Sequence, residues 1–241
     1  MCLTDRQTSR MVEPVQRWRI AFRRGSPALD LGPPEIVRAW EAGLAASGIP
    51  LVLSATATPR PRLTFAAPLP PGRAAEHDLA DMVLGERWTL PRLRPALEAA
   101  LPAGFTLVDL YDVWLGAPSI TASLGAMSFR VLVGAVTAIE LGTAAEALLA
   151  ALTLERIRAK GDRGVTYDLR QLILDLAVSP ADAAGAAAFR MLLRTASDGP
   201  SGRPDEVLLA AGEILGRKLE LVDLVRERLW TSDEMPALDS D

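Results

Sequence analysis

Cysteine, histidine and lysine are almost absent from this chain of 241 residues. Cys2 is the only cysteine, which excludes an internal disulfide and a cysteine-ligated zinc or iron–sulfur centre. His77 is the only histidine, and its neighbours Glu76 and Asp78 would point to the opposite face of a strand. We therefore expect a surface histidine and no metal site. The sequence contains no nucleophile elbow and no glycine-rich phosphate loop, so we expect no cofactor and assign no catalytic residue.

The chain also lacks a long apolar run. No stretch of about 20 residues is free of charge, proline and glycine, so we expect no membrane span. Residues 1–16 are polar and lack the apolar core of a signal peptide. The sequence therefore predicts a cytoplasmic protein whose residues 1–16 and 231–241 are poorly ordered.

Arginine is plentiful, and it is unevenly distributed. Only Lys160 and Lys218 are lysine among 26 basic residues, which suits planar contacts to phosphate or carboxylate but also fits an alanine- and arginine-rich genome. The net charge of −4 argues against a polyanion binder by bulk charge. Residues 17–75 nevertheless hold eight arginines against three acidic residues, whereas residues 117–241 hold 13 basic and 18 acidic residues. Positive charge is therefore concentrated towards the amino end.

Residues 17–24, RWRIAFRR, alternate between large apolar and mostly basic residues. This period of two predicts a strand with its apolar residues on one face. Pro33 and Pro34 suit the start of a helix, and Gly48 suits its end. Similar signals predict the first series of elements: strand 17–24, helix 33–48, strands 51–55, 62–67 and 77–84, helix 89–101 and strand 105–115.

The order of elements roughly repeats in the second half of the chain. The predicted series is strand 127–135, helix 142–152, strands 154–160 and 165–175 around the turn GDRG, strand 189–196, helix 203–216 and strand 219–230. Each series follows a β-α-β-β-α-β plan with additions. We therefore predict an α+β protein of two ferredoxin-like halves with mainly antiparallel sheets, residues 17–116 and 117–230.

Several segments resemble a known family. They are RWRIAFRRG, GIPLVLSATATPRPRLTFAAPLPPG and LPAGFTLVDL in the first half, and VTYDLRQLI, GRPDEVL and VRERLW in the second. Together these segments are similar to the radical-SAM-linked domain of unknown function, over roughly residues 17–230. The most specific part is PRPRLTFA (59–66), followed by LPPG (69–72).

The resemblance implies a partner. Members of this family are encoded beside, or fused to the end of, a radical SAM protein. A radical SAM enzyme needs three cysteines for its cluster and this chain has one, so the resemblance implies an accessory role. The chain departs from the family pattern at TATPRP (56–61), which replaces Gly-Phe-Asn-Pro-His-Pro, and at ALDL (28–31), which keeps only Asp30 of a Ser, His and Asp set.

The proline-rich segment 54–72 contains the first candidate site. Its five prolines flank the predicted strand 62–67, and because proline lacks an N–H and fixes φ, they stiffen both connections. One interpretation is a rigid loop that protects a strand edge from aggregation. The other is that Arg60 and Arg62 are held in position for a ligand.

The first strand contains the second candidate site. If its apolar residues face the helices, Arg17, Arg19 and Arg23 lie on the open face of the sheet, as in many RNA-binding modules. No aromatic residue of this strand shares that face, so phosphate contact or docking on an acidic protein fits better than base stacking. The alternative is a solvated face, or ion pairs with the acidic second half.

Two further candidates lie in the second half. On a strand, Asp168 and Arg170 would share a face and either hold an anionic group or pair with each other. Arg203 lies at the start of the predicted helix 203–216, whose amino end favours anions, although ordinary capping explains it equally. The large aromatic residues expected in or near the cores are Trp40, Trp88, Trp114 and Trp230.

The sequence therefore favours a non-catalytic binding or accessory module that works with a radical SAM protein and contacts RNA through its arginine-bearing sheet. The rival hypothesis is an RNA-modifying or RNA-processing enzyme with a site between the two halves. Convergence of Asp30, Arg62, Asp168 and Arg170 in one cleft would favour the enzyme, whereas an open basic sheet would favour docking. A third hypothesis is an assembly protein whose open sheets pair with each other.

Overall fold

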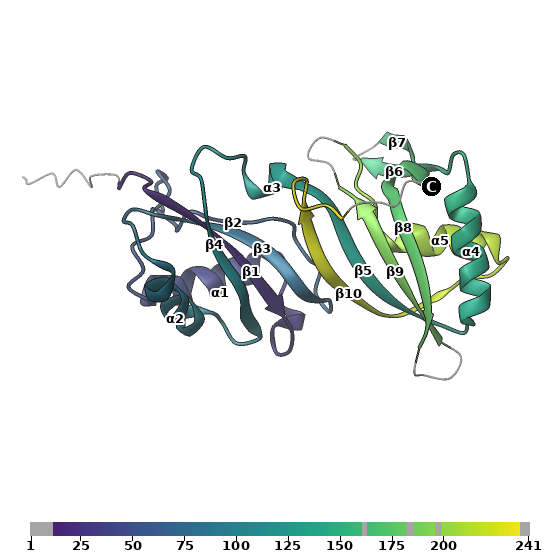
Figure 1. The fold of residues 1–241 in the computed structure, drawn as a ribbon, viewed down its shortest axis with the longest axis horizontal. Coiled ribbons are helices and arrows are strands. Elements are labelled where there is room, and N and C mark those ends of the chain that lie inside the picture. Colours follow the sequence, from purple (N-terminus) through teal and green to yellow (C-terminus); the bar gives the residue numbers. More distant parts are fainter. Residues whose placement is uncertain (1–11, 161–162, 182–185, 196–198, 237–241) are drawn as a thin grey trace, which may run out of the picture.

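The computed structural model describes residues 12–160, 163–181, 186–195 and 199–236. The N-terminal half, drawn in purple to blue in Figure 1, carries the first series of elements. Its elements are β1 (Gln16–Arg24), the 3-10 turn η1 (Ala28–Asp30), α1 (Pro33–Ala46), β2 (Leu63–Phe65), β3 (Ala74–Leu84), α2 (Leu90–Ala100) and β4 (Phe105–Val113).

The C-terminal half follows after a linker that contains the short helix α3 (Ile120–Ser123). Its elements are β5 (Leu124–Gly134), α4 (Ala138–Ala150), β6 (Glu155–Lys160), β7 (Arg163–Asp168), the 3-10 turn η2 (Arg170–Leu172), β8 (Ile173–Pro180), β9 (Ala186–Arg194), α5 (Pro204–Ile214) and β10 (Glu220–Thr231). None of the described helices is long and apolar enough to cross a membrane.

The strands of both halves form one sheet in the order β4-β1-β3-β10-β5-β9-β8, with β2 also paired to β3. When the hairpin β6–β7 is left out of the count, the order within each half is the same: the fourth strand, the first, the third and then the second. This is the ferredoxin-like arrangement, and the predicted α+β class with mainly antiparallel pairing is confirmed. The strands β6 and β7 form a separate hairpin.

The two halves meet where β10 runs parallel to the start of β3. Only two residue pairs make this junction, Val225 with Ala74 and Arg226 with Ala75. The yellow strand β10 therefore lies in the middle of the molecule, between the two sets of helices (Figure 1). The sequence predicted two sheets of similar order, and the structure adds the parallel seam that makes them one.

The core of the N-terminal half is aromatic. Trp18, Ile20 and Phe22 of β1 pack on the helices as their alternation predicts, and Trp40 of α1 is fully buried among them. The Phe22 and Trp40 rings meet edge to face, with centroids 4.9 Å apart. The core of the C-terminal half is built instead from alanine, leucine and valine, with few aromatic rings.

Two predicted strands differ from the structure. Residues 51–55 make only isolated bridges, Leu51 with Leu84 and Leu53 with Pro61. At the second bridge the proline offers a carbonyl but no N–H, which limits further pairing there. The predicted strand 165–175 is divided by η2. The chain turns there because Asp168 accepts two backbone N–H bonds and Leu169 turns into the core.

Candidate anion-binding site

The open face expected on β1 is covered in the structure. The linker between the halves crosses this face, and Ile120 of α3 is buried there with Ala21 and Leu79. As a result, Arg17 is only 9% exposed and Arg19 only 7%. The expectation that these two side chains point to solvent is wrong, because the linker places its own apolar residues on the sheet.

Arg19 is neutralised within the N-terminal half. Its guanidinium donates to both carboxylate oxygens of Asp81, at 2.8 and 3.1 Å, and Asp81 lies directly opposite on β3. Burial by itself would lower the pKa of Arg19, but the hydrogen bond and charge of Asp81 raise that pKa above its ordinary value. Arg19 is therefore a structural ion-pair partner, with little left to offer a ligand.

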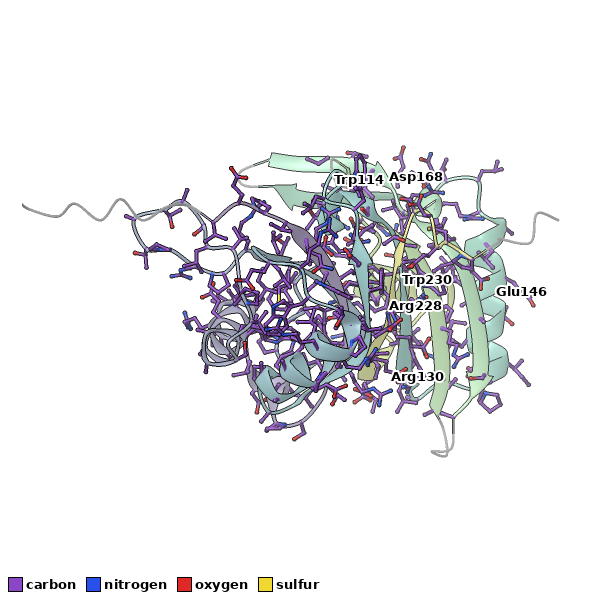
Figure 2. The ribbon with its side chains drawn as sticks, turned by 60° about the vertical axis from the view of Figure 1, so that its left-hand side comes forward. Trp114, Arg130, Glu146, Asp168, Arg228 and Trp230 are labelled. Carbon is purple, nitrogen blue, oxygen red and sulfur yellow. The ribbon has the colours of Figure 1, made fainter. Side chains whose placement is uncertain are left out.

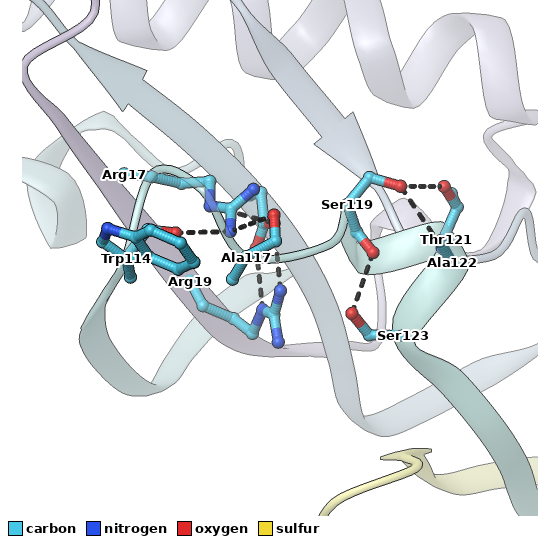
Figure 3. Close-up of polar contacts among 9 residues, drawn as sticks. Arg17, Arg19, Trp114, Ala117, Ser119, Thr121, Ala122 and Ser123 are labelled. Atoms are coloured by element: carbon cyan, nitrogen blue, oxygen red, sulfur yellow. Dashed lines mark hydrogen bonds and ion pairs between the residues drawn. The ribbon is translucent and has the colours of Figure 1, made fainter.

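Arg17 is held differently. Its Nη2 donates to the backbone carbonyls of Trp114 and Ala117, at 2.8 and 3.0 Å (Figure 3). Its buried Nε lies 3.8 Å from a carboxylate oxygen of Asp81 and has no hydrogen-bond partner among the described residues. A buried donor without a partner is uncommon in folded proteins, and it marks a place where an acceptor would be stabilising.

Arg62 lies beside Arg17. The two line a small pocket of about 140 Å³ together with Thr64, Asp81 and Ser119, which we call the Arg62 pocket. The pocket holds two guanidinium groups and one carboxylate, and that carboxylate already binds Arg19. The net charge of its walls therefore favours an anion.

The backbone of Arg62 is fixed although its side chain is exposed. Its N–H donates to the carbonyl of Val52 at 2.8 Å, and its carbonyl accepts from the N–H of Val83 at 3.1 Å. Within the described part of the chain, no carboxylate forms an ion pair with its guanidinium. These two backbone hydrogen bonds hold the main chain of Arg62 in one place and leave the charge of its side chain available.

The other N-terminal candidates lie apart from this pocket. Arg60 is exposed and comes within 3.7 Å of Glu41, a weak surface pair. Arg23 is exposed on β1, where it pairs with Thr106 of β4. Asp30 is exposed at the end of η1. None of these three residues lines the Arg62 pocket.

The C-terminal candidates have local structural roles. Asp168 accepts the backbone N–H groups of Leu154 and Arg170, at 2.8 and 3.0 Å. The Arg170 side chain donates to the carbonyls of Leu149 and Ile173. The predicted pairing of the two side chains on a strand is therefore wrong, because the strand ends at Asp168. Arg203 is exposed at the start of α5 and makes no side-chain cap.

These contacts also bear on the rival hypothesis. Asp30, Asp168 and Arg170 are absent from the lining of the Arg62 pocket, and the hydrogen-bond partners of Asp168 and Arg170 lie in the C-terminal half. The structure therefore does not bring the four residues together in one cleft. No group of three or more metal-ligating residues occurs in the part of the chain that the structure describes.

His77 is half-buried, although the sequence predicted a surface position. Its Nδ1 is buried without a hydrogen-bond partner. Burial lowers the pKa of His77, and the nearby positive charge of Arg228 lowers it further. The guanidinium of Arg228 stacks 4.2 Å from the ring centroid of Trp230 on the same strand (Figure 2).

Trp114 is another residue that sequence reasoning placed wrongly. It was expected near a core, but it is 78% exposed at the beginning of the linker (Figure 2). Its backbone carbonyl accepts a hydrogen bond from Arg17, which lines the Arg62 pocket, and its ring lies over Gly116. The Gly-Ala-Pro that follows Leu115 is a turn signal, and it could have indicated that this tryptophan leaves the strand.

The chain was compared with curated proteins, solved structures and family models. No curated protein sequence matches the chain. Among solved structures, the chain is similar to one in a Cbf5-Nop10-Gar1 complex, with a TM-score of 0.50 and 12% identity over 90% of this chain and 50% of that one. It is also similar to a chain of an archaeal box H/ACA sRNP Nop10-Cbf5 complex, with a TM-score of 0.47 and 12% identity over 90% of this chain. A chain of an H/ACA RNP bound to a substrate RNA gives a TM-score of 0.47 and 11% identity over 89% of this chain. The chain spans about half the length of these solved chains, and at such identity the likeness concerns the fold alone.

A family model matches residues 17–204, which is most of the chain. The match begins at Arg17 and includes β1, the proline-rich segment around β2, and the linker that carries Trp114. The chain therefore belongs to the family described as "Uncharacterized protein conserved in bacteria (DUF2344)".

Proposed function

We propose that the protein is a non-catalytic RNA-binding accessory module whose Arg62 pocket takes a backbone phosphate. The observation that carries this proposal is the pair of guanidinium groups in that pocket. Arg17 is buried with an unpartnered Nε, and Arg62 is fixed by its backbone but has no carboxylate partner among the described residues. A phosphate oxygen would give both groups an acceptor.

The dimensions and surroundings of the pocket favour a phosphate of a nucleic acid. A volume of about 140 Å³ suits one small anionic group and is too small for a nucleotide. Trp114, whose carbonyl accepts from Arg17, lines a different pocket that shares Leu115 with the Arg62 pocket, and its exposed ring is a flat apolar surface on which an unpaired base can stack. A phosphate contact beside a stacking aromatic residue is typical of single-stranded RNA recognition.

The partner that we expect is a radical SAM protein, because of the resemblance noted for segments in both halves. The likeness of the fold to a chain of the Cbf5-Nop10-Gar1 complex is compatible with a role in an assembly, and it brings no ligand to this protein. Purification of the protein from its own cells tests the partner. Repeated recovery without any radical SAM protein would count against it.

The RNA proposal is tested by fluorescence anisotropy with a short labelled single-stranded RNA, titrated at several salt concentrations. Replacing Arg62 by Glu should weaken binding at low salt by about tenfold or more and reduce the slope of log affinity against log salt by about 0.7, the loss of one phosphate contact. Trp114→Ala should weaken binding by about fivefold or more, the loss of one stacked base.

The matched control is Arg203→Glu, the same change of charge at an exposed arginine of the C-terminal half. It should leave the affinity and the salt dependence almost unchanged. Two results would overturn the proposal: no measurable affinity of the unaltered protein at low salt, or equal losses from Arg62→Glu and Arg203→Glu.

A further inference from the structure

A second pocket lies on the opposite face of β2. Leu63 and Phe65 point to the helix side of this strand and line the second pocket, whereas Arg62 lines the pocket already described. The second pocket has a volume of about 340 Å³, and we call it the Arg24 pocket. The residues that line it come from β1, α1, β2, the loop that follows β2, β3 and the start of β4.

Three phenylalanine rings form much of the apolar wall. The ring centroids of Phe65 and Phe105 each lie 5.9 Å from that of Phe22. Ile36 and Val37 of α1 complete this side of the pocket. Packed rings of this kind present a preformed apolar surface, so a ligand with an apolar body would bind without a large rearrangement of the protein.

The floor of the pocket is charged. Arg24 is 1% exposed and Asp78 is 4% exposed, and both line the pocket. Arg226 of β10, which is 2% exposed, binds both oxygens of Asp78 at 2.7 and 2.6 Å. The buried group therefore contains two guanidinium cations and one carboxylate, and its single anion is fully engaged by Arg226.

Arg24 has carbonyl oxygens for partners instead of a carboxylate. Its Nη2 donates to the carbonyls of Leu29 and Leu31, both at 2.8 Å. Its Nη1 has longer contacts, 3.2 Å to the carbonyl of Leu69 and 3.5 Å to that of Pro70. The Nε donates to the carbonyl of Ala28 at 3.2 Å, so Nε and Nη1 are both held less tightly than Nη2. Nη1, which makes the 3.5 Å contact, is the donor that an incoming oxyanion would take.

The environment of Arg24 is unfavourable to its charge. Burial lowers the pKa of Arg24 and the nearby Arg226 lowers it further, while Asp78 opposes both effects. A buried cation without a counter-ion is costly to keep, and carbonyl dipoles offset only part of this cost. An anion in the pocket would remove the imbalance.

We propose that the Arg24 pocket binds a small organic carboxylate with an aromatic or aliphatic body, whose carboxylate accepts from Nη1 of Arg24 and whose body packs on the phenylalanine rings. The apolar walls recognise the body, and the excess of buried positive charge recognises the carboxylate. A volume of about 340 Å³ is at the lower end of the range for small-molecule sites. This proposal does not rest on the proposed RNA binding, because the two pockets share only Thr64 among their lining residues.

The experiment compares two probes by calorimetry, 2-naphthoate and its neutral counterpart 2-naphthalenemethanol. The unaltered protein should bind the carboxylate about tenfold or more tightly than the alcohol, because only the carboxylate makes a charge-assisted hydrogen bond. Val37→Trp fills the pocket from α1 and should abolish binding of 2-naphthoate, while Arg62→Glu should leave it unchanged.

A third pocket, which is separate from both the Arg62 pocket and the Arg24 pocket, provides the control. It lies beside α5, has a volume of about 510 Å³ and is lined by Leu209, which is 58% exposed. Leu209→Trp fills that site and should not affect binding of 2-naphthoate. The proposal is overturned if neither probe binds, if both bind equally, or if Leu209→Trp removes binding and Val37→Trp does not. If Val37→Trp fails to fold, the comparison of the two probes on the unaltered protein decides.

Discussion

The two halves of the molecule share one strand order but have different interiors. The N-terminal half buries Arg17, Arg19 and Arg24 with two aspartates, whereas the buried polar residues described in the C-terminal half are Arg226 and Thr231. Arg226 itself points to Asp78 of the N-terminal half. Because the C-terminal half forms the same arrangement around an aliphatic core, the fold does not require buried arginines. Of the three buried arginines, Arg19 is engaged by Asp81, while Arg17 and Arg24 are the two for which we propose a binding role.

The largest expected effect concerns the ion pair that crosses between the halves. Asp78→Asn leaves Arg226 buried without its ion-pair partner. It also removes the carboxylate that offsets the buried charge of Arg24. We expect the free energy of unfolding to fall by about 3–5 kcal/mol, the usual cost of breaking a buried pair. Urea unfolding monitored by tryptophan fluorescence measures this change.

The control for this prediction is a surface pair on the same sheet. Arg130 is 3.1 Å from Glu76 and 3.3 Å from Glu227, and its side chain is 39% exposed. Arg130→Ala should lower the free energy of unfolding by less than about 1 kcal/mol. If the two substitutions cost the same, Asp78 and Arg226 do not act as a buried pair.

A smaller effect distinguishes the helices of the two halves. In α4, Thr137 accepts from the N–H of Glu140 and the Glu140 carboxylate accepts from the N–H of Thr137, a capping box. Thr89 occupies the equivalent position of α2 and makes no side-chain cap. We expect Thr137→Ala to cost about 1 kcal/mol and Thr89→Ala almost nothing, in thermal or urea unfolding. Equal costs would show that the cap does not stabilise α4.

The smallest effect is a pH dependence at the single histidine. The pKa of His77 is lower in the folded protein than its ordinary value of 6.5. At a pH between the folded-state pKa and 6.5, the unfolded chain therefore binds more protons than the folded protein. Stability should therefore fall as the pH falls below 6.5, and it should fall less in His77→Gln. Because the chain has one histidine, its imidazole resonance in NMR reports the pKa directly. A midpoint at or above 6.5 would contradict the prediction.

Much of the fold could be predicted from local patterns. The alternation in β1 correctly assigned Trp18, Ile20 and Phe22 to the helix side, and the proline starts of α1 and α5 were found from sequence. Those signals lie within one element. The strand register that sets Asp81 opposite Arg19 depends on residues that are far apart in the chain, so no local pattern shows it.

The candidate site was predicted less well for the same reason. Arg62 was proposed from the prolines around it, and it does line a pocket. The sequence did not show that a linker would cover Arg17 and Arg19, because Ile120 and Leu124 give no sign of which surface they will pack on. Asp168 and Arg170 were predicted to share one face of a strand, but the strand ends at Asp168. Asp168 ends it by accepting a backbone N–H bond, and neither proline nor glycine marks this position in the sequence.

The narrow seam between β3 and β10 sets an order of events during synthesis. Asp78 is near the beginning of the chain, but its partner Arg226 belongs to the last described strand. Until that strand has left the ribosome, the carboxylate has no cation from β10 and the start of β3 has a free edge. The early half of the protein therefore reaches its final internal charge balance only after the late half has been made.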